Sequence, residues 1–338
     1  MDRETRAFAE RHFRGLGGRV SDGGGRAPGS VAFIKDPDAF SYADFFKGYL
    51  LPNVPCVFSS AFTEGWGSRR RWVTAAGKPD FDYLLQKYGD VVVPVANCGV
   101  REYNSNPKEH MPLRDYISYW KEYIQGGCSS PRGCLYLKDW HLCRDSSAED
   151  VFTLPVYFSS DWLNEFWDAL DVDDYRFVYA GPTGTWYATW GSQDDTISIN
   201  HNWVNGCNLA NMWHFLQQEL HAVQQEVSQW RDSMPDWHHH CQVIMRSCSG
   251  INFEEFYHFL KVIAERRLLI LGEGLEGHIA ATGLGPQQAA FDIARITEVL
   301  TSVVQHPDFQ RVDTSAFSPQ PEELLQQLEE AVAATASL

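Results

Sequence analysis

Two short motifs in this sequence contain the residue types of a metal site. The run His-His-His-Cys occupies positions 238–241, and His306-Pro307-Asp308 is the single His-x-Asp of the chain. Two imidazoles and one carboxylate bind Fe(II) and leave positions open for a substrate and oxygen. Such a site needs its His-x-Asp on a β-strand, because alternate residues of a strand point to the same side. The elements that carry the two motifs therefore decide what they can do.

The surroundings of both motifs argue against a metal site. Positions 238–241 follow Pro235 and are typical of a helix start, where consecutive side chains diverge by about 100° and cannot all face one ion. Residues 306–308 lie between two predicted helices, and Pro307 suits the start of a helix. We expect ordinary surface, capping and loop residues in both places. The spacing of Cys128, Cys134 and Cys143 is too irregular for a zinc knuckle.

Between about 31 and 206, helical and strand patterns alternate, which predicts a mixed α+β domain. Ser41, with Asp44 three residues later, predicts a helix N-terminus. Further helices are expected over 81–89, 111–127 and 161–170, the second with Leu113, Tyr116, Ile117, Trp120 and Ile124 at helical spacing. Strands are expected after Pro55 and over 91–96, 134–140 and 175–181, and Pro94 favours an edge position for the second of these.

Beyond 206 the pattern indicates helices only. Residues 209–230 place a long apolar stripe on one side of a helix, and Asn252 with Glu255 has the spacing of a capping box. Pro286 and Ser318-Pro319 predict two more helix starts. We therefore divide the chain into a Gly-rich leader at 1–30, a mixed domain at 31–206 and a helical C-terminal subdomain at 207–338.

Composition limits the partners. Lys plus Arg number 28 and Asp plus Glu 44, and a net charge of −16 repels phosphate backbones, so we expect no nucleic acid partner. No stretch reaches the roughly 18 apolar residues of a membrane span, and MDRETRAF has charges where a signal peptide is apolar. None of the 8 cysteines forms a Cys-x-x-Cys pair. Reduced thiols and a cytosolic or nuclear setting fit best.

Four segments resemble the jumonji-C oxygenases, in the family's order. They are YLLPNVPCVF (49–58), LYLKDWHL (135–142), YRFVYAGPTGTW (175–186) and DDTISINHNWVNG (194–206). The resemblance implies a cupin-like double-stranded β-helix that uses Fe(II) and 2-oxoglutarate. The last three segments and the block from 207 to 330 are together similar to a cytosolic branch of the family that hydroxylates a lysine of the eukaryotic translation termination (release) factor. Members of the family often dimerise through C-terminal helices, so a homodimer is a further expectation.

The chain departs from the family between Trp186 and Asp194. At this point the family continues into His-x-Asp, several strands including one with a cofactor-binding lysine, and a distal iron-binding histidine. Only residues 187–193 join the two matching segments here, and a single strand takes roughly 5–6 residues. We therefore expect an incomplete β-helix with an internal deletion near 186–194 and no bound iron. A splice variant or a gene-model error would each give such a junction.

Two positions match residues that contact 2-oxoglutarate in the family. Tyr136 matches a hydroxyl that reaches the co-substrate, and Asn202 matches an amide that lines the same pocket. A half-buried strand aromatic and a strand-end hydrogen-bonding residue are the alternative interpretations. His201 is expected to be a structural histidine on a strand. For the whole chain, the alternatives to an inherited hydroxylase are a non-catalytic binding or dimerisation module and an unstable splice product.

Overall fold

The computed structural model describes residues 31–100, 106–142, 151–170, 176–181, 195–272 and 285–336. These residues form two compact units. The first unit comprises the described residues within Met1–Val57, Val156–Asp171 and Trp203–Leu338, and the second those within Phe58–Pro155 and Val172–Asn202. The expected leader at 1–30 and the junction at 187–193 lie outside the described residues. The domain boundary predicted near 206 follows a change in the sequence pattern, whereas the two units are groups of residues in contact. The boundary stays a prediction.

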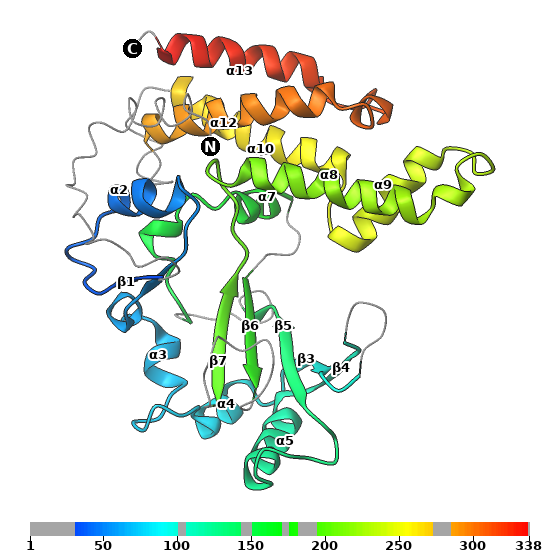
Figure 1. The fold of residues 1–338 in the computed structure, drawn as a ribbon. Coiled ribbons are helices and arrows are strands. Elements are labelled where there is room, and N and C mark those ends of the chain that lie inside the picture. The colour runs from blue at the N-terminus through cyan, green and yellow to red at the C-terminus, as the bar shows by residue number, and fades with distance from the viewer. Residues whose placement is uncertain are drawn as a thin grey trace. The chain divides into compact units, whose positions relative to one another are not determined.

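The second unit is built on a five-stranded antiparallel sheet (Figure 1). The order of its strands is β4-β3-β5-β6-β7. Their bounds are β3 (Val92–Asn97), β4 (Lys108–Pro112), β5 (Leu135–Trp140), β6 (Arg176–Gly181) and β7 (Thr196–His201). The accompanying helices are η2 (Ser60–Thr63), α3 (Gly67–Arg71), α4 (Phe81–Tyr88) and α5 (Leu113–Gln125).

One face of this sheet packs against α5. Tyr116, Ile117 and Trp120 of that helix are fully buried with Val95 and Leu137 of the sheet. The Tyr116 hydroxyl donates to the carbonyl oxygen of Leu135 at 3.4 Å and accepts the Leu137 N–H at 3.2 Å. Because the phenol bonds to both a carbonyl oxygen and an N–H group of the buried strand, it fixes α5 on the sheet as well as filling the core.

β5 contains a bulge that keeps its apolar residues on the α5 side. Leu137 pairs with Ala180 and Trp140 pairs with Val178, so β5 has one more residue than β6 between the two pairs. Asp139 takes up this residue with a left-handed φ of 62°. As a result Leu137 and Trp140 both belong to the same buried cluster although they lie three positions apart.

The first unit combines a helical assembly with a small two-stranded sheet. Its N-terminal elements are β1 (Ala32–Ile34), α2 (Tyr42–Phe45), which continues as a π-helix η1 (Phe46–Leu50), and β2 (Cys56–Phe58), whose last residue falls in the second unit. The helices that follow are η3 (Val156–Phe158), α7 (Trp162–Leu170), α8 (Leu209–Glu226), η4 (Ser228–Trp230), α9 (Trp237–Ser249), α10 (Phe253–Gly272), α12 (Pro286–Gln305), η5 (Phe309–Arg311) and α13 (Pro321–Ala336).

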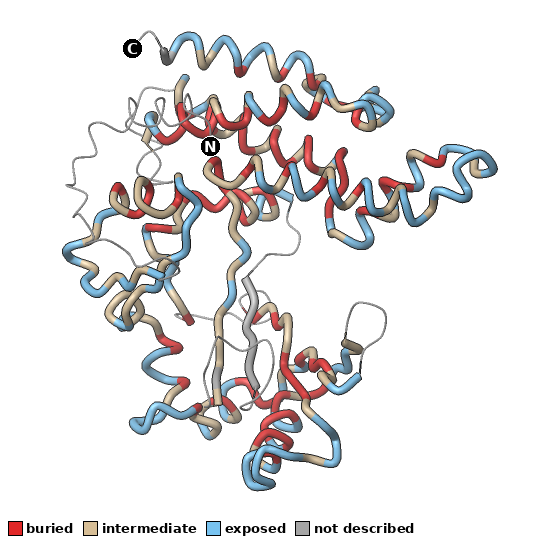
Figure 2. Tube along the Cα trace, viewed as in Figure 1, coloured by how far each residue is buried: buried red, intermediate tan, exposed pale blue. Residues whose placement is uncertain are grey.

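The core of this unit lies between α10 and its neighbours. α10 packs on α12 and α7, and α12 packs on α13. Figure 2 shows buried positions along the facing sides of α10 and α12. Phe256, Phe259 and Ile296 are completely buried there. The apolar stripe expected over 209–230 packs against the core as far as Val227, but Trp230 lies in η4 and is 47% exposed.

Arg267 is a charged residue inside this apolar core. Its Nε donates to Asp292 at 2.7 Å, and its two terminal nitrogens donate to the two oxygens of Glu165 at 2.8 and 2.7 Å. The Gln288 amide donates to the other Asp292 oxygen at 2.8 Å, and the Tyr42 hydroxyl donates to Gln288 at 3.1 Å. This network joins α7, α10 and α12 to α2.

Local signals predicted the helix ends well. Ser41 and Asp44 form a reciprocal capping box, Asn252 and Glu255 form another, and Gly126 ends α5. Two details were wrong. Ile124 is 39% exposed, because Tyr119 and Tyr123 occupy the inner side of α5 instead.

The edge position predicted for Pro94 was the other error. β3 lies inside the sheet between β4 and β5. The proline is accommodated because the β5 register covers only Val95 to Asn97 and stops short of Pro94.

The mixture of helices and sheet agrees with the predicted α+β class. The described strands form two open sheets, of two and five strands, and not a closed barrel. No helix in the described ranges is long and apolar enough to cross a membrane.

Candidate functional site

Tyr136 lies in the middle of the five-stranded sheet. It is 1% exposed and faces away from α5, since its neighbours Leu135 and Leu137 both point into the α5 core. Burial raises the pKa of Tyr136 to about 12, and Cys98 and Asp139 add to the rise. The side chain is therefore a neutral phenol at physiological pH. A neutral phenol can donate a hydrogen bond.

Asn202 directly follows β7 and is exposed. β6 separates β5 from β7, which places the two strands about 10 Å apart. The register aligns Leu137 with Ala180 and Ala180 with Ile197, so Tyr136 is level with the beginning of β7. Asn202 lies beyond the other end of that strand. The structure therefore does not bring Tyr136 and Asn202 side by side, and their roles as co-substrate contacts stay predictions.

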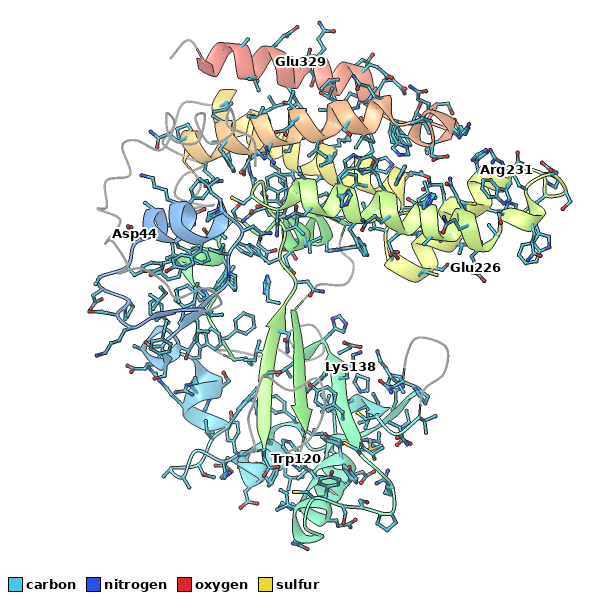
Figure 3. The ribbon with its side chains drawn as sticks, viewed as in Figure 1. Asp44, Trp120, Lys138, Glu226, Arg231 and Glu329 are labelled. Carbon is cyan, nitrogen blue, oxygen red and sulfur yellow. The ribbon has the colours of Figure 1, made fainter. Side chains whose placement is uncertain are left out.

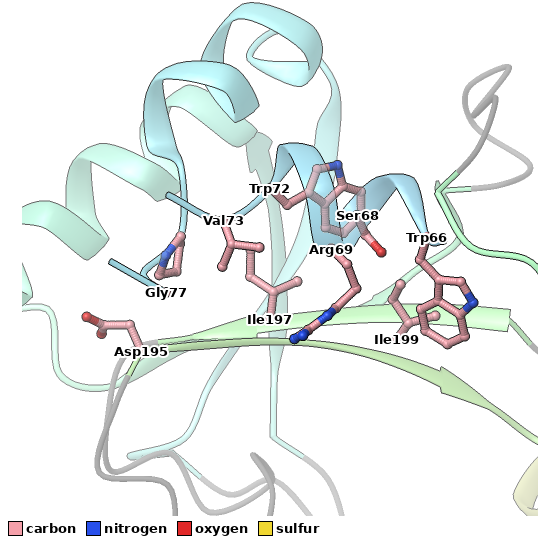
Figure 4. Close-up of a pocket in the computed structure, with 10 residues that line it drawn as sticks. Trp66, Ser68, Arg69, Trp72, Val73, Gly77, Asp195, Ile197 and Ile199 are labelled. Atoms are coloured by element: carbon pink, nitrogen blue, oxygen red, sulfur yellow. The ribbon is translucent and has the colours of Figure 1, made fainter. Parts of the chain in front are cut away.

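A cavity of about 350 Å³ lies beside β7, on the face of the sheet opposite to Tyr136 (Figure 4). Ile197 and Ile199 line it from the strand, and Trp66 and Trp72 line it from around α3. Arg69 extends from α3 over the strand between these apolar groups. Such a cavity suits a small ligand with an apolar body and a negative group. Tyr136 is not among its lining residues.

Trp120 holds the beginning of β7 beside this cavity. Figure 3 labels Trp120 on α5. Its indole Nε1 donates to an Asp195 carboxylate oxygen at 3.0 Å. Asp195 also lines the cavity, at the end opposite Trp66. The sequence offered no sign of this site, because its residues come from segments more than 100 positions apart that have no shared periodicity.

The His-x-Asp motif lies at the end of α12, where the sequence placed it. His306 is the C-cap of that helix, and its Nδ1 accepts the backbone N–H of Asp308 at 3.2 Å. The ring packs against Trp213 and Phe253 with centroid distances of 5.6 and 5.2 Å. Burial lowers the pKa of His306, although the nearby Asp308 opposes the change. This histidine is a packed structural group.

One of the three consecutive histidines lies next to the His-x-Asp motif in the folded chain. His238 is the second residue of α9, and its Nδ1 lies 3.4 Å from Asp308. Asp308 also forms an ion pair with Arg311 at 3.0 Å. Cys241 is completely buried one turn later. The helix placement predicted for positions 238–241 is thus confirmed. His239 and His240 point elsewhere on the helix and take no part in the Asp308 contacts.

The residues that the structure describes do not supply the ligand set that the iron of a 2-oxoglutarate oxygenase requires. In the described ranges no three His, Cys, Asp or Glu side chains come together so as to hold a metal ion. The full sequence has no histidine between His141 and His201, the interval that contains β6. His201 itself lies at the end of β7, opposite Arg176 of β6. An imidazole pair therefore cannot be supplied by the segment that joins these strands.

Comparisons with known proteins identify the relatives of the chain. No protein-family model matches it. It is 64% identical to the human protein "2-oxoglutarate and iron-dependent oxygenase JMJD4" and 62% identical to the mouse protein of the same name, with full coverage of both chains in each case. The chicken protein of that name is 46% identical, covering 98% of this chain and 99% of its own length.

The human alignment is longer than the chain. It spans 419 positions, whereas this chain has 338 residues, so the relative has many residues without a counterpart here. This is the relation expected of a shorter variant, and the jumonji-C resemblance is confirmed. The chain is a shortened member of the family of jumonji-C domain-containing protein 4 (JMJD4), the 2-oxoglutarate and iron-dependent oxygenases.

Proposed function

We propose that this chain is a form of its oxygenase family that has lost the iron centre and acts by binding rather than by catalysis. One observation carries the proposal: the single His-x-Asp of the whole sequence is built into the end of α12, with its ring packed between aromatic side chains. A facial triad needs that pair on a strand that faces the co-substrate. The absence of histidine from 142 to 200 supports the same conclusion.

The five-stranded sheet is, in this proposal, the remainder of a double-stranded β-helix. β6 and β7 correspond to the segments that resemble the strands before and after the iron ligands. They pair directly over their whole length, from Arg176 with His201 to Gly181 with Thr196. The residues that the relatives have and this chain lacks would have formed the intervening strands, lost through a splice variant or a gene-model error.

The catalytic half of the proposal is tested by comparison with the human relative. Both proteins are incubated with Fe(II), ascorbate, 2-oxoglutarate and a lysine-containing peptide of the translation termination release factor. We expect the human protein to add one oxygen to the lysine, as the resemblance implies, and this chain to add none. Mn(II) binding, measured by electron paramagnetic resonance, gives a readout independent of turnover. Hydroxylated lysine that depends on Fe(II) and 2-oxoglutarate would contradict the proposal.

The binding half rests on the first unit. Its buried core and the Arg267 network involve only residues outside the interval between β6 and β7. We therefore expect cooperative unfolding of this unit, which would argue against an unstable product. Immobilised chain should retain the release factor without modifying it, and sedimentation should show whether a dimer forms. Failure to retain the release factor, together with a monomer in sedimentation, would refute a binding role.

Residual 2-oxoglutarate binding forms a separate part of the proposal. Tyr136 and Asn202 are the positions that match co-substrate contacts of the family. Titration of the chain with 2-oxoglutarate, followed by calorimetry, should give weaker binding in Tyr136→Phe and Asn202→Ala than in the parent chain. Tyr123→Phe, a change in α5 on the other side of the sheet, serves as the control. Equal binding by all four proteins would remove both residues from the site.

A further inference from the structure

Cys98 and Cys134 lie directly opposite each other across the β3–β5 ladder. The register ends with Asn97 opposite Leu135, and its continuation by one residue would set the two cysteines opposite each other. The Cys98 N–H donates to the Cys134 carbonyl oxygen at 2.9 Å, so the ladder continues to this point. Opposed residues of antiparallel strands have Cα atoms about 4.5–5.5 Å apart. A disulfide requires roughly 4.4–6.8 Å, so the backbone is already positioned for one.

The two side chains also meet. Each thiol is free, each is partly exposed, and the two form a hydrogen bond with each other. The phenol of Tyr123 provides a second hydrogen bond to Cys134. A small oxidant can therefore reach the pair from solvent, and paired strands hold the two backbones at a spacing that a disulfide can span.

The two thiols are not equivalent. The hydrogen bonds from Cys98 and then Tyr123 stabilise the Cys134 thiolate and lower its pKa to about 7, although burial opposes the change. The pKa of Cys98 is raised, because its thiol bonds to Cys134 and is partly buried. Since the thiolate is the reactive form, Cys134 is the nucleophile and Cys98 the resolving thiol.

We propose that Cys98 and Cys134 form a peroxide-sensitive dithiol site, which closes reversibly to a disulfide between β3 and β5. The Cys134 thiolate attacks one oxygen of a hydroperoxide, the O–O bond breaks, and a sulfenic acid and hydroxide (or alkoxide) result. The Cys98 thiol then attacks the Cys134 sulfur, the S–S bond forms, and water leaves. Two thiols are oxidised by two electrons and one peroxide bond is reduced. The proton lost by Cys134 converts the hydroxide (or alkoxide) into water (or an alcohol). The proton of Cys98 leaves with the hydroxyl group of the sulfenic acid as water.

The position of the site gives the disulfide a consequence. Cys134 lies one residue before β5, the strand that carries Tyr136. Oxidation would fix β3 to β5 at the end nearest Tyr136. The proposal needs neither iron nor the proposed binding function, because it concerns only the chemistry of the thiols.

The test uses the full chain, treated with one equivalent of hydrogen peroxide and mapped by mass spectrometry without reduction. We expect one linked peptide pair joining residues 98 and 134, a loss of two hydrogen atoms, and full reversal by dithiothreitol. In Cys98→Ser the reaction should stop at a Cys134 sulfenic acid that dimedone traps. In Cys134→Ser the consumption of peroxide should fall at least tenfold. Cys248→Ser, which changes an exposed thiol on α9, should behave as the parent chain does.

Three outcomes would overturn the proposal. They are a link between other cysteines in preference to 98 and 134, oxidation of Cys248 or Cys128 as fast as that of Cys134, and the same reaction pattern in urea-unfolded chain. The last comparison also covers a variant that fails to fold. A misfolded Cys134→Ser would show the unfolded pattern and not a selective loss.

Discussion

Replacing Arg267 with leucine should strongly destabilise the first unit. Its side chain is 2% exposed, and the Asp292 side chain with which it bonds is completely buried. Burial raises the pKa of Asp292, and the guanidinium of Arg267 with the amide of Gln288 opposes the rise. Leucine would remove three charge-assisted hydrogen bonds and leave the Asp292 carboxylate without a cation. Removing one partner of a buried pair costs about 3–5 kcal/mol.

The effect can be measured by thermal unfolding, followed by circular dichroism in the helix band. A change of 1 kcal/mol shifts the Tm of a domain of 150–250 residues by roughly 2–4 °C, so a decrease of roughly 6–20 °C is expected. Lys261→Ala is the matched control on the same helix. Lys261 forms a partly exposed pair with Glu265 at 3.0 Å, which is worth about 0.5 kcal/mol or less.

A double variant distinguishes the destabilising effect of an unpaired buried charge from that of lost packing. In Arg267→Leu/Asp292→Leu no unpaired charge is left in the core, so part of the lost stability should return. If Arg267→Leu costs less than about 1 kcal/mol, or no more than Lys261→Ala, the reasoning is refuted. If the double variant is as unstable as the sum of the single variants, the charge is not the cause.

Three further predictions concern the same unit. Gly206→Ala should cost about 1–3 kcal/mol, because a Cβ would lie 2.9 Å from Phe291 Cε1, whereas Gly48→Ala meets nothing within 4 Å and should be nearly neutral in urea unfolding. Asn252→Ala should cost about 1 kcal/mol through loss of the α10 cap, and an unchanged urea midpoint would contradict this. Burial lowers the pKa of His306, so the unfolded chain binds the proton more readily. Stability should therefore decrease as the pH falls below about 6.5, and His306→Gln should flatten that dependence.

Local signals in the sequence predicted most of the helix ends and the strand segments. The capping box at Ser41 and the one at Asn252 depend on side chains within three residues, so each can be recognised from its own segment. The helix at positions 238–241 and the turn at His306 followed from neighbouring prolines in the same way. Helix ends that depend on residues within one short segment could therefore be predicted from the sequence.

Features that depend on strand order were beyond the sequence. Pro94 was misplaced because the register that tolerates it is set by β5, some 40 positions away. The distance between Tyr136 and Asn202 depends on β6 lying between their strands. The pairing of Cys98 with Cys134 likewise needs the ladder, since their spacing in sequence follows no helical or strand period. Candidate sites in a sheet therefore require the pairing of its strands to be known first.

At the Asp139 bulge, β5 can change in length by one residue. Deletion of a residue elsewhere in a strand would turn every later side chain to the opposite face. Without Asp139, Lys138 would separate Leu137 from the tryptophan in regular alternation, and both apolar residues would still face α5. The deletion would remove a left-handed backbone conformation together with the ion pair between Asp139 and Lys108. Insertions and deletions among homologous chains should accordingly be tolerated at this point of the strand and selected against on either side of it.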